Sequence, residues 1–430
     1  MTTFRAETYQ NEFLAEGASE VDAIVTITSG PGGDPAGAVG MRTPGSTEAV
    51  EIILLDCSGS MGQPPTKIQQ ARKATAAAID CIRDGVWFAV VRGSNIAVPV
   101  YPVPTGLIPA SEATRTAAKQ AVARLMPEGG TAIGTWLEAA TSLCATRPNA
   151  IHHAILLTDG RNESQPIADF DAAIASSKGR FQCDCRGVGT DWDVAELRKV
   201  ASALLGSVDI VADPHELEAD FRSMTEQAMG KAVRRVELRV WAPQGATVLF
   251  VKQVAPTIED LTTRAEPVNA LTFDYPTGSW GEEARDYHVC IRVNAATVGS
   301  EMLAARVSLV VGDEVVSQAL VKAIWTDDLA LSTRINREVA HYTGQAELAQ
   351  AIQEGLEARN SGDEGTATTR LGRAVQLAAE SGNDATTKLL AKVVDVEDAA
   401  TGTVRLRRDV DEADEMALDT RSTKTARVTR

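Results

Sequence analysis

Between residues 48 and 229, short apolar runs alternate with segments that have helical spacing. The runs at 51–56 and 151–158 are apolar on both faces, whereas residues 67–83 are rich in alanine and place polar residues at helical intervals. Strands buried on both faces and separated by amphipathic helices are typical of a mostly parallel sheet covered on both sides. Further strands are expected at 87–91, 179–187 and 208–211, and helices at 111–125, 135–143, 193–205 and 214–229. The pattern predicts a Rossmann-like, doubly wound α/β domain over residues 47–230.

After residue 231 the chain changes to short segments in which apolar and polar positions alternate, broken by Pro, Gly and Asn. This pattern predicts an antiparallel β-sandwich over residues 231–326. The N-terminal segment has the same character, and an isolated hairpin there would be marginal in water. We therefore expect residues 3–29 to pair into the sandwich, with the α/β domain inserted in it and the Gly- and Pro-rich end of residues 1–46 as a linker.

Residues 327–400 have a helical pattern, in which 346–360 and 366–381 are expected to form an antiparallel hairpin. One such pair faintly resembles a tetratricopeptide unit, although ordinary helical packing is the favoured interpretation because a single unit cannot bury its own face. The mixed-charge and Thr-rich stretch 401–430 is expected to be a disordered tail. The predicted fold class is therefore multidomain, with α/β, β and α parts.

The charge balance limits the possible partners. The chain has 42 Lys+Arg against 58 Asp+Glu, a net charge of −16, which argues against general affinity for nucleic acid or anionic membranes. No stretch approaches the ~20 apolar residues of a spanning helix, and the polar N-terminus makes a secretory signal unexpected. The six cysteines show no disulfide framework. These features favour a cytoplasmic protein, and the Ala-rich, Lys-poor composition favours a bacterial one.

The loop after the strand at 51–56 carries the most informative chemistry. The strand ends at Asp56, and Ser58 and Ser60 follow at alternate positions. Alternate side chains of an extended loop can point the same way, so the three oxygen-bearing groups can converge on one point. The alternative is that these residues simply cap the following helix.

Two further oxygen donors are expected at the same place. Asp159 follows the strand at 151–158, and the glycine-rich loop 129–134 contains Thr131. The carboxyl ends of parallel strands share one edge of a sheet, where ligands usually bind. Two carboxylates and three hydroxyls, with no His or Cys, suit Mg²⁺ or Mn²⁺ and disfavour zinc. A partner's carboxylate would fit the remaining position on such an ion.

At these residues the chain closely resembles the von Willebrand factor A family, over about residues 48–229. The family's metal-ion-dependent adhesion site reads Asp-x-Ser-x-Ser, then a distant Thr, then an Asp. All are present here in order, as Asp56, Ser58, Ser60, Thr131 and Asp159. The resemblance implies an intact site of the bacterial intracellular type. It also implies that the hydroxyls approach the metal, that the aspartates often act through water, and that the last helix, 214–229, can shift with ligand state.

The favoured function is metal-dependent binding or scaffolding of a protein partner that supplies an acidic residue. An alternative is a phospho-regulated signalling adaptor in which Thr420, Thr423 or Thr425 is phosphorylated. A metal-dependent hydrolase is less favoured, because the sequence contains no Gly-x-Ser-x-Gly elbow and no Walker loop and indicates no general base. We therefore expect no enzymatic activity.

Several other residues invite a functional interpretation but favour a structural one. Cys183 and Cys185 lack a second cysteine pair and would share one face of a strand, so packing is preferred to metal binding. Cys57 is expected to point into the core. Trp136 is interpreted as a packing residue. His152 and His153 begin a strand remote from any evident acid–base partner and are also interpreted as structural.

Overall fold

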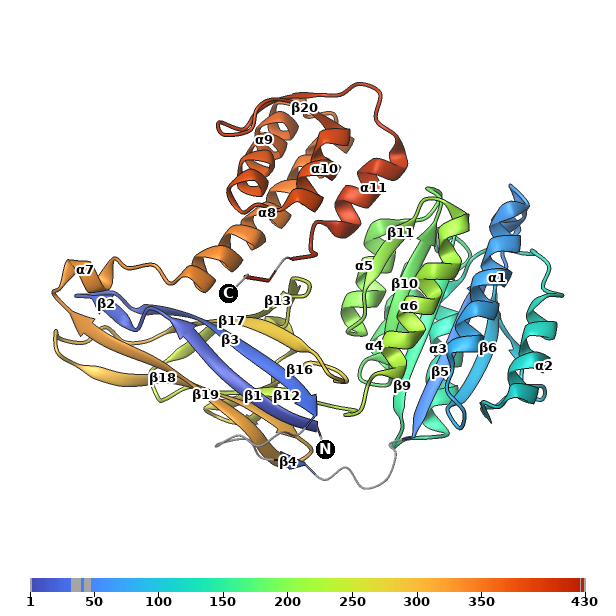
Figure 1. The fold of residues 1–430 in the computed structure, drawn as a ribbon, viewed down its shortest axis with the longest axis horizontal. Coiled ribbons are helices and arrows are strands. Elements are labelled where there is room, and N and C mark those ends of the chain that lie inside the picture. The colour runs from blue at the N-terminus through green and yellow to red at the C-terminus, as the bar shows by residue number, and fades with distance from the viewer. Residues whose placement is uncertain (1, 32–39, 42–47, 426, 429–430) are drawn as a thin grey trace. The chain divides into compact units, whose positions relative to one another are not determined.

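The computed structural model describes residues 2–31, 40–41, 48–425 and 427–428, which form two compact units (Figure 1). One unit is Pro44–Arg234, and the other combines Met1–Thr43 with Arg235–Arg430. The first is therefore inserted in the sequence of the second, which confirms the predicted insertion. The predicted linker falls mostly at 32–39 and 42–47, which lie outside the described residues.

The inserted unit contains a seven-stranded sheet. In spatial order its strands are β11 (Val208–Val211), β10 (Gln182–Val188), β9 (Ile151–Thr158), β5 (Ala49–Asp56), β6 (Trp87–Gly93) and β7 (Ala97–Tyr101), with β8 (Ile108–Pro109) also paired to β6. The pairs from β11 to β6 are parallel, whereas β7 and β8 run antiparallel to β6. The sheet is mostly parallel, as predicted. The sequence pattern missed β7 because Pro99 interrupts it, and proline is tolerated in such an edge strand.

Helices cover the sheet of this unit (Figure 1). They are α1 (Thr66–Cys81), α2 (Glu112–Val122), α3 (Ile133–Ala145), α4 (Ile167–Ser177), α5 (Val194–Ala203) and α6 (Leu217–Met229). Helix α1 packs against α2 and α6, while α4 packs against α3 and α5. Ile53 and Leu55 belong to the core that contains the α1 and α6 residues, and their neighbours Ile52 and Leu54 are equally buried. The central strand is thus apolar on both faces because both faces are covered.

Trp136 of α3 is fully buried, and its Nε1 donates to the backbone oxygen of Ser94 at 2.9 Å. Its ring lies directly against Gly93, the last residue of β6, where a Cβ atom would overlap the indole. This contact confirms that Trp136 is a packing residue. It also explains why glycine ends this strand.

Replacing Gly93 with alanine is therefore expected to lower the free energy of unfolding by about 1–3 kcal/mol, because the indole must move within a close-packed core. Urea denaturation of the full chain measures this change. Gly106→Ala in the same unit is the matched control, since no atom lies within 4 Å of the Cβ position there. Equal stability of the two variants would contradict the prediction.

The second unit contains a sandwich of two six-stranded sheets. One has the order β14 (Glu259–Asp260), β13 (Thr247–Ala255), β17 (Ala284–Arg292), β3 (Glu20–Pro31), β1 (Thr2–Gln10) and β4 (Gly40–Met41). The other has the order β15 (Glu266–Asn269), β16 (Thr272–Pro276), β12 (Glu237–Trp241), β18 (Glu301–Val311), β19 (Glu314–Thr326) and β2 (Phe13–Ala15). The N-terminal strands β1 and β3 lie in the same sheet as β13 and β17, as predicted.

A helical part follows the sandwich. Its elements are α7 (Leu329–Ser332), α8 (Arg337–Asn360), α9 (Glu364–Glu380), α10 (Asp384–Val393), β20 (Val394–Asp398), β21 (Thr403–Leu406) and α11 (Glu412–Arg421). Helices α8 and α9 pack against each other as the expected hairpin. No helix among the described residues combines the length and the apolar composition required to cross a membrane.

The structure corrects the prediction of a disordered tail at 401–430. Strand β21 pairs with β20, and α11 packs against α8 and α10. Leu418 of α11 is fully buried in the core that α8, α9 and α10 share. The tail has so few apolar residues that its sequence, considered alone, predicts disorder. In the structure, those apolar residues complete a core made by the preceding helices. Residues 426, 429 and 430 of the predicted tail lie outside the described residues.

Candidate metal centre

The candidate site lies at the carboxyl-end edge of the parallel sheet. Strand β5 ends at Asp56, and its neighbour β9 ends immediately before Asp159. A short 3-10 helix, η1 (Gly59–Gly62), follows β5 and leads toward α1. The backbone NH of Gly59 donates to the oxygen of Gly129 at 2.9 Å, and that of Glu128 donates to the oxygen of Cys57 at 2.7 Å. The serine loop and the loop that carries Thr131 are thus tied together.

The two serines and Asp159 form a continuous chain of oxygen atoms. Ser58 Oγ lies 2.9 Å from Ser60 Oγ, and Ser60 Oγ donates to Asp159 Oδ1 at 2.6 Å. The backbone NH of Ser58 donates to Asp56 Oδ1 at 2.7 Å, which draws the loop back toward the end of β5. The simple capping alternative does not describe this loop, because Ser58 makes no side-chain cap bond to η1.

Thr131 joins the same cluster. A Cβ atom built on Gly160 would lie 3.1 Å from Thr131 Oγ1 and 3.6 Å from Ser60 Oγ, so both hydroxyls border one small space. Thr131 is buried, and its backbone oxygen accepts from the NH of Ser164 at 2.9 Å. The structure therefore brings together all five residues that the sequence indicated.

Asp56 is fully buried, and its carboxylate has no cationic partner among the described residues. Thr158 Oγ1 donates to Asp56 Oδ2 at 2.5 Å. Burial raises the pKa of Asp56 to about 6, with the nearby charge of Asp159 adding to the effect. A buried carboxylate without a counter-charge is costly, and a divalent cation would remove that cost.

Lys67, near the start of α1, is a site residue that sequence reasoning missed. Its Nζ donates to Asp159 Oδ2 at 2.8 Å and to Asp191 Oδ2 at 3.2 Å, and its side chain is only 8% exposed. Burial lowers the pKa of Lys67, but the bonds to Asp159 and Asp191 raise it further, so the ammonium stays charged. Its only sequence signal is a lysine soon after the serine loop, in a helix otherwise rich in alanine.

Cys57 does not take part in this cluster. It lies in the hydrophobic core with the α1 and α6 residues, as expected. Burial, together with the charge of Asp56, raises the pKa of its thiol to about 12. The thiol therefore stays protonated at neutral pH and is a poor nucleophile.

The donor set consists of carboxylate and hydroxyl oxygens. Such a set fits Mg²⁺ or Mn²⁺ and disfavours softer metals. No group of three or more His, Cys, Asp or Glu side chains with the arrangement of a metal site occurs in the described part of the chain, and the candidate centre itself combines only two carboxylates with three hydroxyls. Cys183 and Cys185 are fully buried, with their sulfurs 4.0 Å apart, which agrees with packing.

His153 is not remote from acidic partners, and this corrects the sequence interpretation. Its Nδ1 lies 2.9 Å from Glu51 Oε1, and its Nε2 lies 2.9 Å from Asp184 Oδ2. The three residues come from the adjacent strands β5, β9 and β10, whose register places Glu51 opposite His153 and Asp184 opposite Ile155, two residues further along β9. This network lies within the sheet and shares no residue with the candidate metal centre.

The three threonines proposed for phosphorylation are not on a free tail. Thr420 lies in α11, is 1% exposed and donates to the oxygen of Met416 at 2.8 Å. Thr425 Oγ1 donates to the oxygen of Val254 at 2.6 Å, and the oxygen of Thr423 accepts from the NH of Ile258 at 2.8 Å. A kinase would need these residues released, so the structure does not favour that alternative.

Comparison with protein families and solved structures gives a consistent result. Residues 51–210 match the model of the von Willebrand factor type A domain, and residues 376–422 match that of the von Willebrand factor type A C-terminal domain. The structure is similar to a von Willebrand factor type A protein from Catenulispora acidiphila, with 51% identity, a TM-score of 0.93, and coverage of 99% of this chain and 98% of that one. A comparison with curated proteins gave no match.

Two more distant structures share the fold. The ArnB paralog VWA2 from Sulfolobus acidocaldarius has 14% identity and a TM-score of 0.58, with coverage of 98% of both chains. The human COPII-coat protein Sec24c has 10% identity and a TM-score of 0.54, with coverage of 89% of this chain and 57% of that one. At such low identity, these similarities concern the fold alone.

Proposed function

Because this chain belongs to the von Willebrand factor type A family, we propose that it is a protein-binding scaffold that holds Mg²⁺ or Mn²⁺ at the candidate metal centre. The observation that carries this proposal is the convergence of three hydroxyls and two carboxylates on one rim, where the buried Asp56 has no cationic partner among the described residues. A bound divalent ion would supply a Lewis-acid site for an acidic side chain of a partner.

The residues of this chain have separate tasks in the proposed centre. Ser58, Ser60 and Thr131 would offer hydroxyl oxygens to the ion, while Asp56 and Asp159 supply negative charge. Asp56 orients the loop through the NH of Ser58, and Asp159 orients Ser60 by accepting from its hydroxyl. The donors are therefore positioned before the ion binds, which lowers the cost of assembling the centre.

We further propose that the centre binds without catalysing a reaction. A hydrolase would need a free general base beside the ion. Both oxygens of each carboxylate at the rim already accept hydrogen bonds, Asp56 from Ser58 and Thr158, and Asp159 from Ser60 and Lys67.

The six free cysteines support the expected cytoplasmic location.

Titration calorimetry of the metal-free full chain with Mg²⁺ and Mn²⁺ tests the metal centre. The native chain is expected to bind either ion, and the double variant Ser58→Ala, Ser60→Ala is expected to bind at least about tenfold more weakly because two oxygen ligands are removed. The matched control is Ser142→Ala, Ser176→Ala, because among the described residues those hydroxyls donate to helix carbonyls in the same unit, those of Glu138 and Ala173. Equal binding by both double variants would contradict the assignment.

A second titration separates metal binding from the proposed partner chemistry. Acetate supplies a soluble carboxylate, and acetamide is its uncharged control. Acetate is expected to tighten Mn²⁺ binding to the native chain, because it completes the coordination of the ion as a partner's side chain would. If acetate and acetamide act alike while the metal still binds, the metal centre stands and the acidic-partner proposal fails.

A further inference from the structure

Residues 423–425 and 427–428, called the C-terminal segment below, lie along the β-sandwich. The oxygen of Thr423 accepts from the NH of Ile258 at 2.8 Å, and the NH of Thr425 donates to the oxygen of Pro256 at 3.0 Å. Lys424 forms an antiparallel bridge with Thr257 between these two bonds. The segment thus adds to the sandwich beside the end of β13 in the manner of a short extra strand.

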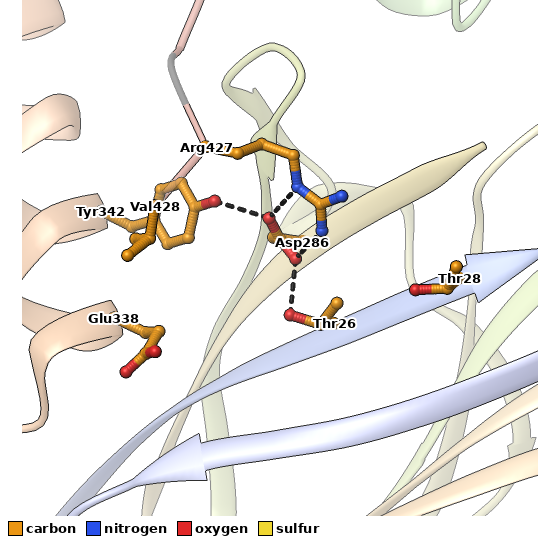
Figure 2. Close-up of a pocket in the computed structure, with 7 residues that line it drawn as sticks. All are labelled: Thr26, Thr28, Asp286, Glu338, Tyr342, Arg427 and Val428. Atoms are coloured by element: carbon orange, nitrogen blue, oxygen red, sulfur yellow. Dashed lines mark hydrogen bonds and ion pairs between the residues drawn. The ribbon is translucent and has the colours of Figure 1, made fainter. Parts of the chain in front are cut away.

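The segment ends with an arginine bound to a buried carboxylate. Arg427 Nε and Nη2 donate to Asp286 Oδ2 and Oδ1 at 2.9 and 2.8 Å, a two-bond geometry that guanidinium provides and ammonium does not (Figure 2). Asp286 also accepts from Thr26 Oγ1 at 2.6 Å and from the Tyr342 hydroxyl at 2.5 Å. Burial would raise the pKa of Asp286, but these donors hold the pKa below its ordinary value.

A cavity of about 250 Å³ surrounds this ion pair (Figure 2). Its lining residues come from strand β3, strand β17, helix α8 and the segment itself: Thr26, Thr28, Asp286, Glu338, Tyr342, Arg427 and Val428. Val428 packs against an apolar cluster of Ile24, Val254, Ala255 and Tyr342. We call the surface that Arg427 and Val428 contact, made by Asp286, Tyr342 and the apolar cluster, the groove. The groove offers a carboxylate for a guanidinium and, next to it, an apolar surface for the residue that follows.

The two sides of this contact differ in how firmly they are held. Asp286 is 2% exposed and Tyr342 is 2% exposed, and both belong to long elements, β17 and α8. The Arg427 side chain is 42% exposed, and the described contacts of its segment include backbone hydrogen bonds, the ion pair with Asp286 and the packing of Val428. Segments with few buried contacts open at low free-energy cost, whereas the groove persists with the folded unit. An opened groove would leave Asp286 buried without a cation, which favours rebinding of a guanidinium.

We propose that this groove is a binding site for an extended peptide that carries an arginine followed by an apolar residue, and that residues 423–425 and 427–428 of the same chain occupy it as a releasable segment. This site is separate from the candidate metal centre, and its assignment does not depend on the proposed function. Its ligand is recognised by the arginine fork at Asp286, the strand-like backbone bonds at Pro256 and Ile258, and the apolar contact made by Val428.

The test measures binding of a fluorescein-labelled peptide with the sequence of residues 423–430, Thr-Lys-Thr-Ala-Arg-Val-Thr-Arg, to the full chain by fluorescence anisotropy. In the native chain the attached segment competes at an effective concentration on the order of millimolar. In Arg427→Ala the attached segment has lost its guanidinium. We therefore expect the peptide to bind Arg427→Ala at least about tenfold more tightly than it binds the native chain.

Four controls make the result specific. Arg407→Ala removes a similarly exposed arginine of the same unit, whose partner is Asp395, and should leave peptide binding at the native level. A peptide with alanine in place of its first arginine should not bind Arg427→Ala. Adding Asp286→Asn to Arg427→Ala should abolish binding, and Tyr342→Phe in its place, which keeps the ring and removes one donor to Asp286, should weaken it.

Tighter binding to Arg427→Ala that depends on the peptide's arginine and on Asp286 or Tyr342 supports the proposal. Equal binding to the native chain and to Arg427→Ala, binding that survives loss of the peptide's arginine, or no binding to a folded Arg427→Ala chain would overturn it. Far-ultraviolet circular dichroism of each variant establishes that it is folded.

Discussion

Replacing His153 with leucine is expected to lower the free energy of unfolding by about 3–5 kcal/mol. The imidazole lies between two carboxylates, Glu51 and Asp184, at 2.9 Å from each. The Glu51 side chain is fully buried, and that of His153 is only 12% exposed. Burial opposes a charge on His153, but the charge of Glu51 and the bond to Asp184 dominate and raise its pKa to about 10. Leucine would fill the space while leaving two carboxylates without their shared cation.

The same network predicts a specific pH dependence. Because the pKa of His153 is about 10 in the folded chain and 6.5 as its ordinary value, the folded chain binds the proton more tightly than the unfolded chain. Its stabilisation is therefore complete below about pH 6.5 and is lost as pH rises through about 10. Urea denaturation across this range should show falling stability in the native chain and a smaller fall in His153→Leu.

His152→Leu is the matched control for this prediction. His152 precedes His153 in the same strand, but its nitrogens bond to the backbone oxygens of Arg147 and Arg180. Its loss removes no carboxylate partner, so the expected destabilisation is smaller. The role assigned to the network would be refuted if His152→Leu lowered the free energy of unfolding as much as His153→Leu does. It would also be refuted if the pH dependence of stability were unchanged in His153→Leu.

Replacing Lys67 with methionine should lower the stability of the metal-free chain and tighten the binding of Mg²⁺. The substitution keeps an unbranched side chain in the buried space but removes the ammonium that holds Asp159 Oδ2. Leaving Asp159 buried without its cation should lower the unfolding free energy of the metal-free chain by about 3 kcal/mol. Mg²⁺ binding should become tighter by on the order of 2–3 kcal/mol, about a hundredfold, because a positive charge no longer repels the ion.

Two measurements on the same variant check this prediction. Thermal unfolding without metal should show a lower midpoint, and added Mg²⁺ should raise that midpoint more in Lys67→Met than in the native chain, since tighter binding to the folded state stabilises it more. Lys199→Met, which removes an exposed lysine paired with Asp171 in the same unit, is the control. If Lys67→Met binds Mg²⁺ no more tightly than Lys199→Met, Lys67 does not set the charge of the centre.

The role of Lys67 bears on what the centre would bind. The buried groups Asp56, Asp159 and Lys67, counted without the exposed Asp191, together carry one net negative charge when all are ionised, so a divalent ion would make this buried part of the centre net positive. Without Lys67 the loaded centre would be neutral. A buried lysine beside the proposed metal residues would thus weaken the hold on the ion and strengthen the attraction for an acidic side chain of the proposed partner.

Much of the fold and of the candidate site could be predicted from local sequence pattern. The apolar runs at 51–56 and 151–158 identify β5 and β9, and strands of this kind are parallel, so Asp56 and Asp159 are expected at one edge of the sheet. The alternate spacing of Ser58 and Ser60 then directs both hydroxyls toward that edge. These predictions succeed because they need only the period of a strand and the direction of its neighbours.

Other features required the tertiary structure. The partnership of Lys67 with Asp159 depends on where α1 lies against the sheet, and the Glu51–His153–Asp184 network depends on the register of three strands. Helix α11 forms because it packs on a core made by earlier helices, and Arg427 is held because Asp286 lies on a strand far from it in the sequence. Local pattern carries the periodicity that selects helix or strand, but contacts between distant residues are decided by packing. The sequence by itself therefore determined the order of the domains and the oxygen donors of the rim, while packing decided which charges those donors face and where the C-terminal segment lies.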